Sequence, residues 1–419
     1  MIILRLVLKS LWNRRGVAAL TVFAITISVT LFLSVDKIRT GARDSFANTI
    51  SGTDVIVGAR TGPVQLLLYA VFRIGNATNN ISWKSYLDIE KQRETEWVVP
   101  ISLGDSHKGF RVLGTTQVYF EKFRYARKRS LSFQVGRPFS HVLDVVLGAE
   151  VAKELGYDVG DKIIISHGLD KAGFTKHDNL PFSIVGVLAA TGTPVDQTVH
   201  ISLQGIEAIH IGWGSGSRTR NRAIGPQDIE TMKLQPKAVT AVLVGLKSKM
   251  QVFRFQRAIN EYSGEPLMAI LPGVALQELW TLMGTVEKAL VIISMFVVIA
   301  GLLGMLTMIL SGLNERRREM AILRSVGAMP VHIMALFVIE ALLLSVVGAC
   351  LGVVLTFVGL GLAQSFIEAQ YGLYLTVSPP GMREGIVVLG VAAAGAIVGL
   401  WPAWRAYRLS VADGLVVRL

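Results

Sequence analysis

Four long apolar runs stand out from an otherwise mixed pattern of hydrophobic and polar positions. They are Val17–Val35, Ala289–Leu313, Ile333–Ile367 and Gly385–Ala403. Each is long enough to cross a bilayer, which takes about 20 apolar residues in a helix. The third run carries one acid, Glu340, and the others carry no charge. The pattern predicts four membrane-spanning helices.

Residues 36–288, between the first two runs, have the composition of a soluble domain. Runs of β-branched and aromatic residues between turn residues predict strands, and amphipathic runs predict helices. The expected strands are Asp54–Val57, Trp97–Leu103, Phe110–Leu113, Lys162–Ser166, Phe182–Leu188, Val199–Leu203 and Val239–Lys247. The expected helices are Ser82–Arg93, Ala149–Leu155 and Lys249–Tyr262, and a flexible loop is expected at Gly212–Gly216. The fold class is therefore α+β: four transmembrane helices with a large α+β domain inserted between helices 1 and 2.

Three helical patterns extend beyond the apolar runs. Ile2–Arg15 has apolar residues at helical spacing and predicts an amphipathic helix in the membrane interface. Asp36–Ile50 remains compatible with a helix that continues the first span. No proline interrupts Gly273–Leu313, which predicts one helix roughly 60 Å long at about 1.5 Å per residue. We expect this helix to tie the soluble domain to the membrane.

Basic residues are unevenly distributed around the four runs. Met1–Gly16, Ser311–His332 and Trp404–Leu419 hold four, four and three Lys/Arg, whereas Gln364–Glu384 holds one. Lys and Arg near the ends of spans accumulate on the cytoplasmic side. Both termini are therefore expected in the cytoplasm, and residues 36–288 are expected outside it.

The formal net charge of +12 changes this picture little. Much of the positive charge lies in the cytoplasmic flanks, where topology and attraction to anionic membrane lipids account for it. The run Lys122–Arg129 and the arginines Arg218, Arg220 and Arg222 are expected on solvated faces or loop tips, so no nucleic-acid partner is predicted. The one cysteine, Cys350, lies inside the third run, and residues 36–288 therefore contain no internal disulfide.

No catalytic or cofactor-binding motif occurs in the chain. A Gly-x4-Gly-Lys-Ser/Thr phosphate loop is absent, so we expect ATP to be bound and hydrolysed by another polypeptide. A Gly-x-Ser-x-Gly nucleophile motif is absent as well. No histidine pair has the spacing of a zinc site, although convergence of the external histidines in the folded domain stays open. The histidines are His107, His141, His167, His177, His200, His210 and His332.

A strongly charged segment, Asn314–Met329, lies between the second and third runs. It combines charges of both signs with a glycine-alanine pair, and its key residues are Glu315, Arg316, Arg317, Arg318, Glu319, Arg324, Gly327 and Ala328. Their spacing closely resembles the cytoplasmic coupling segment of ABC-transporter permeases of the MacB/LolC/FtsX type. In that family the segment docks on an ATPase, so the resemblance assigns these eight residues to ATPase coupling. The alternative is a basic loop that only sets membrane topology.

Two further stretches resemble the same family. The glycine pattern of Val145–Ser166, followed by Phe182–Leu188, is similar to the family's external domain, and Pro402–Leu415 resembles its closing Pro-Ala-x-x-Ala motif. The resemblance supports a membrane-proximal lobe, about 36–103 and 236–272, and an inserted lobe, about 104–235. MacB itself carries its ATPase in the same chain, so the missing phosphate loop brings this layout closer to LolC and FtsX.

The resemblance implies a permease subunit that couples ATP hydrolysis by a separate ATPase to conformational work in the periplasm. The family precedents include lipoprotein release and tripartite efflux. Expected partners in the bacterial inner membrane are a cytoplasmic ABC ATPase dimer, a second permease copy or paralogue, and a periplasmic adaptor or lipoprotein. The alternative is a membrane-anchored scaffold or sensor that regulates a periplasmic partner without transport.

Three residues of the third run, Glu340, Gly348 and Gly352, are interpreted as structural. A charge at membrane depth is costly and usually faces protein or an aqueous path, so Glu340 is expected to contact its own bundle or a partner subunit, or to lie near the inner interface. Gly348-x-x-x-Gly352 and Gly395-x-x-x-Gly399 permit close helix approach. The sequence leaves open whether they pack within one bundle or between two copies.

Overall fold

A computed structural model describes residues 2–126, 128–167, 180–211, 229, 232, 234–371 and 379–408. The chain divides into two compact units. The first, here called the bundle, comprises Met1–Gly41, Gly284–Phe366 and Leu375–Leu419. The second, here called the domain, comprises Ala42–Met283 with Ile367–Tyr374. The predicted loop Gly212–Gly216 lies outside the described residues.

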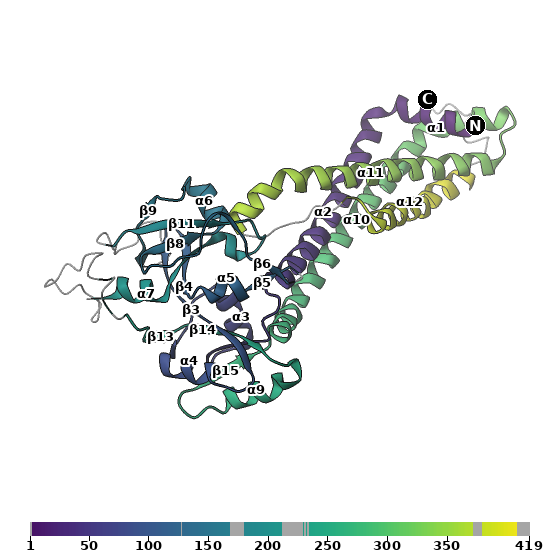
Figure 1. Ribbon diagram of the computed structural model, residues 1–419. Helices are drawn as coiled ribbons and strands as arrows, with labels where there is room; N and C mark the ends of the chain where they lie inside the picture. The colour runs from purple at the N-terminus through teal and green to yellow at the C-terminus, as the bar shows by residue number, and fades with distance from the viewer. Residues whose placement is uncertain are drawn as a thin grey trace. The chain divides into compact units, whose positions relative to one another are not determined.

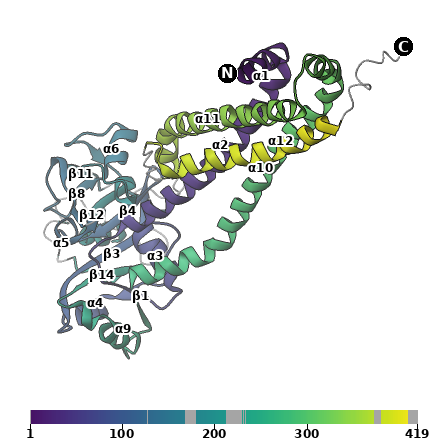
Figure 2. The same ribbon diagram turned by 90° about the vertical axis from the view of Figure 1, so that its right-hand side faces the viewer.

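The bundle is helical. Its helices are α1 (Ile2–Asn13), α2 (Arg15–Thr49), α10 (Pro272–Ser325), α11 (Pro330–Tyr371) and α12 (Met382–Arg408). Within the bundle, α2, α10, α11 and α12 lie side by side (Figures 1 and 2) around one buried apolar cluster. Among the described residues four segments are long and apolar enough to cross a membrane, and they are Arg15–Arg43, Pro272–Ser311, Pro330–Gln364 and Met382–Arg405. Four long apolar helices at the positions of the four predicted spans are thus confirmed.

The long helix α10 runs without a break from Pro272 to Ser325. Its 54 residues extend about 80 Å along the helix at about 1.5 Å per residue, which confirms the continuous helix predicted from Gly273. The charged segment is therefore the last turns of α10 and not a helix of its own. The reason is local, because α10 contains no proline after its first residue, Pro272, and no left-handed residue occurs until Gly327, just beyond its end.

The domain is built on one large sheet. Its strands are β1 (Val55–Ala59), β3 (Thr95–His107), β4 (Phe110–Thr115), β7 (Phe133–Gly136), β8 (Asp144–Leu147), β9 (Lys162–Ile163), β10 (Ser166–His167), β11 (Phe182–Leu188), β12 (Thr198–Ser202), β14 (Ala241–Leu246) and β15 (Leu267–Ile270). The order is β15-β1-β14-β3-β4-β12-β8-β11-β7, with β10 beside β3 and β9 beside β11. The β4–β12 and β8–β11 pairs are parallel, and the other pairs are antiparallel. Two further small ladders pair β2 (Ile81–Ser82) with β13 (Ala238–Val239) and β5 (Arg124–Tyr125) with β6 (Arg129–Ser130).

Strand β3 joins the strands of the two predicted lobes. Its first half, Thr95–Ile101, pairs with β14, and its second half, from Ser102 onward, pairs with β4. The ladder is thus continuous across the boundary expected near residue 103. The two predicted lobes share one sheet, and the division into a membrane-proximal and an inserted lobe stays a prediction.

Short helices accompany the sheet in the domain. They are α3 (Pro63–Phe72), α4 (Trp83–Glu90), α5 (Val118–Lys122), α6 (Ala149–Leu155), α7 (Leu203–His210) and α9 (Val252–Asn260), with 3-10 turns at Pro194–Gln197 and Lys249–Gln251. Helices α4, α6 and α9 confirm the three predicted helices. Ser82 caps α4, because its hydroxyl accepts a hydrogen bond from the Ser85 amide at 3.3 Å. Helices α3, α5 and α7 were not predicted.

Candidate functional site

The charged segment ends in a tight turn between α10 and α11. Gly327 has φ +99°, a left-handed conformation that glycine adopts without steric penalty. The Ala328 amide donates to the Leu323 carbonyl at 2.9 Å, and the Gly327 amide donates to the Arg324 carbonyl at 3.0 Å. This pair of bonds is the Schellman motif that closes a helix. Pro330 then opens α11 at the position that proline favours, so Gly327 and Ala328 shape the turn.

The charged residues lie on the last turns of α10. Four of them are described by their helical backbone alone, and they are Glu315, Arg316, Arg317 and Arg318. Glu319 is exposed and Arg324 is half-buried, whereas Met320 and Ala321 between them are buried in the bundle. The segment is therefore anchored on one face, and the structure brings the predicted coupling residues together at one end of α10.

Four large apolar side chains are exposed around the same turn. Their exposed fractions are 52% for Ile322, 83% for Val326, 63% for Met329 and 53% for Val331. The first three lie beyond the apolar spans of α10 and α11. Val326 directly follows α10, and its amide donates to the Ile322 carbonyl at 3.1 Å, so the helical path continues to Val326 and the two side chains share a face. We call these four residues the apolar tip. They were not predicted from the sequence, although the four-residue spacing of Ile322 and Val326 inside a charged segment indicates a shared apolar face.

Gly348 and Gly352 of α11 lie directly against α2. A Cβ at Gly348 would stand 2.8 Å from the Cβ of Ile25, and a Cβ at Gly352 would stand 2.8 Å from the Cβ of Val29. The Thr26 hydroxyl donates to the Gly348 carbonyl at 3.2 Å across the same contact. Of the two arrangements that the sequence left open, packing within one chain accounts for this pair of glycines.

The second glycine pair lies between α12 and α11. A Cβ at Gly395 would stand 2.7 Å from the Cβ of Ser345, and a Cβ at Gly399 would stand 2.7 Å from the Cβ of Ala341. Both glycine motifs are therefore occupied by close helix contacts inside the bundle.

An ion pair joins three helices at the end of the bundle that lies away from α1. Lys37 Nζ of α2 lies 2.6 Å from Glu384 Oε1 of α12, and 5.2 Å from the ring centroid of Phe357 in α11. The other Glu384 oxygen accepts from the Gly381 amide at 2.7 Å, which caps α12. The sequence reading did not anticipate this contact, because its members are separated by hundreds of residues.

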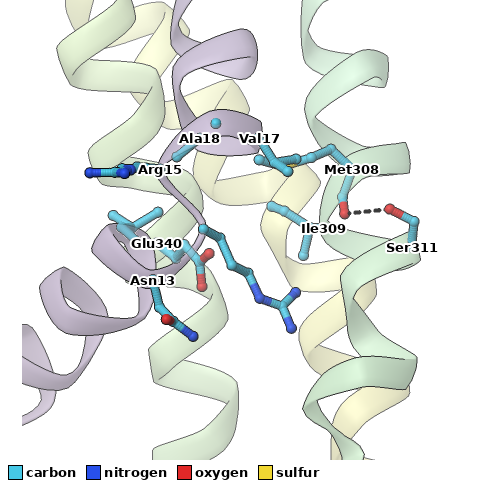
Figure 3. A pocket seen from close by; sticks show the side chains of 11 residues that line it. Asn13, Arg15, Val17, Ala18, Met308, Ile309, Ser311 and Glu340 are labelled. Atoms are coloured by element: carbon cyan, nitrogen blue, oxygen red, sulfur yellow. Dashed lines mark hydrogen bonds between the residues drawn. The ribbon is translucent and has the colours of Figure 1, made fainter.

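Glu340 is buried, and it lines a cavity of about 440 Å³ in the bundle. The walls come from α1, the elbow between α1 and α2, the first turn of α2, α10 and α11; they are Leu11, Asn13, Arg14, Arg15, Gly16, Val17, Ala18, Met308, Ile309, Ser311 and Glu340. Figure 3 shows the Glu340 carboxylate between Asn13 and Ile309, with Met308 and Ser311 on the far wall. The acid thus faces its own bundle at a polar hollow.

The part of the domain that the structure describes holds no candidate metal centre. Among the described residues, no group of three His, Cys, Asp or Glu side chains is placed to hold a metal ion, and His177 lies outside them. The His107 ring is held by the Ile164 carbonyl, 2.7 Å from Nδ1, and by the Tyr157 hydroxyl, 3.1 Å from Nε2. Burial lowers the pKa of this ring.

His200 is fully buried on β12, and its ring centroid lies 5.5 Å from that of Tyr119 and 5.8 Å from that of Phe120. Neither ring nitrogen has a hydrogen-bond partner within the described part of the chain. Burial, reinforced by the nearby charge of Arg73, lowers the pKa of His200 to about 3. The ring is therefore neutral at physiological pH and serves as an apolar filler in the domain core.

Two family models match the chain. A MacB-like periplasmic core domain matches residues 18–262, and an FtsX-like permease C-terminal domain matches residues 291–411. The chain therefore belongs to the family of ABC-transporter permeases that carry a MacB-like periplasmic domain and an FtsX-like membrane part. The four apolar helices and this family together make it an inner-membrane protein.

Several curated relatives are similar over most or part of the chain. The macrolide export ATP-binding/permease protein MacB of Bordetella avium is 23% identical over 98% of this chain and 59% of its own length. MacB of Nitrobacter winogradskyi is 22% identical over 95% of this chain and 57% of its own. MacB of Azoarcus sp. is 26% identical over 58% of this chain and 34% of its own. The chain thus spans between a third and three-fifths of these relatives.

Among solved structures, the periplasmic region of MacB from Actinobacillus actinomycetemcomitans aligns with 55% of this chain and 94% of its own. The sequence identity is 11% and the TM-score is 0.35.

Proposed function

We propose that this chain is a permease subunit that converts ATP hydrolysis by a separate ABC ATPase into conformational work of its domain outside the cytoplasm. The observation that carries the proposal is the turn between α10 and α11, where an apolar tip follows the end of a helix whose sequence carries charges of both signs. Family membership supports a partnership with an ABC ATPase.

The apolar tip and the charges have complementary uses in docking. Desolvating a side chain such as Val326 supplies affinity at about 25 cal/mol per Å² of apolar surface removed from water. Charges such as Glu319 and Arg324 fix the register of an encounter more than its strength. The buried Met320 and Ala321 hold the segment against the bundle, so a push on the tip is passed into the helices and not lost in a loose loop.

Two continuous helices support transmission of that push. Both α2 and α10 contribute residues to the bundle and to the domain. In the bundle the Ser28 hydroxyl of α2 donates to the Val297 carbonyl of α10 at 3.1 Å. In the domain the Phe46 ring of α2 lies 5.7 Å from the Trp280 ring of α10 and 4.4 Å from the Phe72 ring of α3. The two helices are thus packed on each other within each unit.

Charge asymmetry supports an orientation with both termini and the turn in the cytoplasm and the domain in the periplasm. In that orientation, the family precedents favour lipoprotein release or efflux through a tripartite assembly as the work performed. A second permease copy and a periplasmic adaptor or lipoprotein are the partners that this work requires.

The docking role is tested by placing one charge in the apolar tip and the same charge beside it. Val326→Asp removes the most exposed apolar side chain of the tip, and Ser325→Asp adds an equal charge at an exposed polar neighbour. The tagged chain is purified from native membranes, and the co-purifying ATPase is measured by protein amount and by ATP hydrolysis. Val326→Asp should lower the amount of co-purifying ATPase about tenfold or more, because fully burying a valine side chain contributes roughly 1.5 kcal/mol or more to binding.

Ser325→Asp should have a clearly smaller effect on the same measurement. Equal losses in the two variants would leave charge alone as the cause and remove the tip from the docking surface. An unchanged ATPase signal in both variants, with the chain still in the membrane, would reduce the turn to a topogenic loop.

A further inference from the structure

Helix α9 lies on the outside of the domain beside β15 (Figures 1 and 2). It turns Phe255 and Ile259 inward, and each of these is 1% exposed. Two other apolar side chains point outward. Phe253 is 70% exposed, and Met250, in the 3-10 turn that leads directly into α9, is 92% exposed. Single exposed apolar residues are common on protein surfaces, so the surroundings of this pair decide what it indicates.

The exposed side of α9 has the composition of an interface. Met250, Phe253, Arg254 and Arg257 follow one another at spacings that place them on one side of the helical path, and all four are exposed. We call these four residues the α9 face. Aromatic residues, Met and Arg are enriched in protein interfaces, whereas Lys, Glu and Ser are depleted there. The composition of the α9 face is therefore typical of a docking surface.

Arg254 is held in place by a buried acid. Its Nη2 lies 2.5 Å from Glu94 Oε1, and the Arg254 side chain is 75% exposed whereas the Glu94 side chain is 10% exposed. The end of β14 is tied to the same place, because the Lys247 amide donates to the Glu94 carbonyl at 3.0 Å and Lys247 Nζ donates to the Arg93 carbonyl at 2.9 Å. A guanidinium fixed in this way loses less conformational entropy when it binds a partner.

The surroundings of the α9 face are basic. The two segments that meet there, residues 91–96 and 247–257, hold six Lys/Arg against two Glu, a net charge of +4. One of the two acids, Glu94, is already paired with Arg254. A surface of this charge attracts an acidic partner, steers its approach and disfavours a basic one.

Three kinds of occupant compete for such a face, and the charges favour one of them. A two-fold contact with a second copy would place the same patch against itself, so the net charge of +4 would meet its own sign. An anionic bilayer would attract the basic residues but repel Glu96 and Glu261, which are exposed at the border of the face. A different protein can place a group of the right sign opposite each of these charges.

We propose that the α9 face docks an acidic amphipathic segment of another protein in the compartment that holds the domain. Apolar side chains of that segment cover Met250 and Phe253 and gain affinity by removing apolar surface from water. Its carboxylates contact Lys249, Arg254 and Arg257, and arginine binds a carboxylate through paired, directional hydrogen bonds. The contact is separate from the turn between α10 and α11 and does not depend on ATPase docking.

The test is photo-cross-linking of the full chain in its native cells from the centre of the face. Phe253→p-benzoylphenylalanine keeps an aromatic ring at this position and reacts on irradiation with whatever covers it. We expect one discrete adduct with another protein, whose cross-linked peptide, identified by mass spectrometry, is rich in Asp and Glu. Val135→p-benzoylphenylalanine is the matched control, because Val135 on β7 is also an exposed apolar residue of the domain, at 51%, and it should not form this adduct.

Charge reversal then tests the complementarity. Lys249→Glu with Arg257→Glu should lower the yield of the Phe253 adduct about tenfold or more, because like charges facing each other across an interface are strongly unfavourable. Lys153→Glu with Lys162→Glu reverses two exposed lysines outside the face and should leave the yield unchanged. The co-purifying ATPase should be the same in both double variants, which separates this contact from the docking of the ATPase.

Each other outcome contradicts the proposal. An adduct with a second copy of the chain would assign the face to self-association, and an adduct with phospholipid would assign it to the bilayer. The absence of any adduct at position 253 would leave the face solvated. A protein adduct whose yield is unaffected by reversing Lys249 and Arg257 would remove the charge complementarity on which the proposed partner rests.

Discussion

Substituting Gly348 by alanine should destabilise the bundle by an amount that the geometry predicts. The added Cβ would stand 2.8 Å from both the Cβ and the Cγ2 of Ile25, and 3.2 Å from the Val22 carbonyl oxygen. The obstacle is the branch point of a β-branched side chain and not a flexible end, so the helices must separate. Overpacking of this kind costs about 1 to 3 kcal/mol. The carbonyl that receives the Thr26 hydroxyl moves with the helix, so that bond is strained too.

A matched control lies on the same helix. A Cβ at Gly359 of α11 meets nothing within 4 Å, so Gly359→Ala should stabilise the helix by up to about 1 kcal/mol through propensity alone. The two alanines are therefore expected to shift stability in opposite directions. The assay is denaturation of the purified chain in detergent micelles by sodium dodecyl sulfate, followed by tryptophan fluorescence.

A double variant identifies the partner of the glycine. Ile25→Ala removes the Cγ2 that the new Cβ would strike but keeps the Cβ, so it should recover only part of the loss caused by Gly348→Ala, with a coupling energy of about 0.5 kcal/mol or more. If Gly348→Ala and Gly359→Ala shift the midpoint alike, the α2–α11 contact is not as close as described. If the midpoint is unchanged while cross-linked dimers disappear, the glycines serve contact between copies.

Two further predictions concern the domain and the orientation. The folded pKa of His200, about 3, lies below the unfolded value of about 6.5, so the domain should keep its full stability above about pH 6.5. Between these two pKa values its free energy of unfolding should fall by up to about 1.4 kcal/mol per pH unit as the pH is lowered. Hydrogen exchange of β8 and β12 should show a smaller pH dependence of stability in His200→Phe, and an equal pH dependence in both proteins would contradict the prediction. Cysteines at the exposed positions Ser130 and Ser325, introduced with Cys350→Ser, should react with an impermeant thiol reagent from opposite sides of the membrane, and labelling from one side would rule out the proposed topology.

Elements whose boundaries are encoded locally could be predicted from the sequence. Helix α6 spans Ala149–Leu155 as expected, because Gly156 follows it in a left-handed conformation with φ +65°. Helix α4 begins where Ser82 offers a capping hydroxyl. The apolar spans were predictable for a similar reason, since length and composition alone decide whether a helix can cross a bilayer. The family signals likewise lie in short, contiguous stretches.

The features that could not be predicted from the sequence depend on contacts between distant segments. Helix α3, Pro63–Phe72, buries most of its side chains, and a helix that is apolar all round has no periodic pattern to detect. The cavity needs Leu11, Met308 and Glu340 to converge from three helices, which no local spacing reveals. The partner of Gly348 could not be predicted for the same reason, because a small-residue motif indicates that another helix packs closely but does not identify that helix.

The contacts of α2 decide how motion can pass through the bundle. Its hydroxyls donate to carbonyls of two other helices: Thr26 to Gly348 at 3.2 Å, Thr30 to Gly352 at 3.2 Å and Ser28 to Val297 at 3.1 Å. Hydrogen bonds between helices in membranes average only about 0.6 kcal/mol each, so these bonds cannot by themselves hold α2 and α11 together against a load. The steric fit at the glycines is the stiffer constraint, because packed atoms already at contact cannot approach further without strain. A displacement that starts at the turn before α11 therefore reaches α2 mainly through packing, and a glycine substitution probes that path more directly than the loss of a hydroxyl.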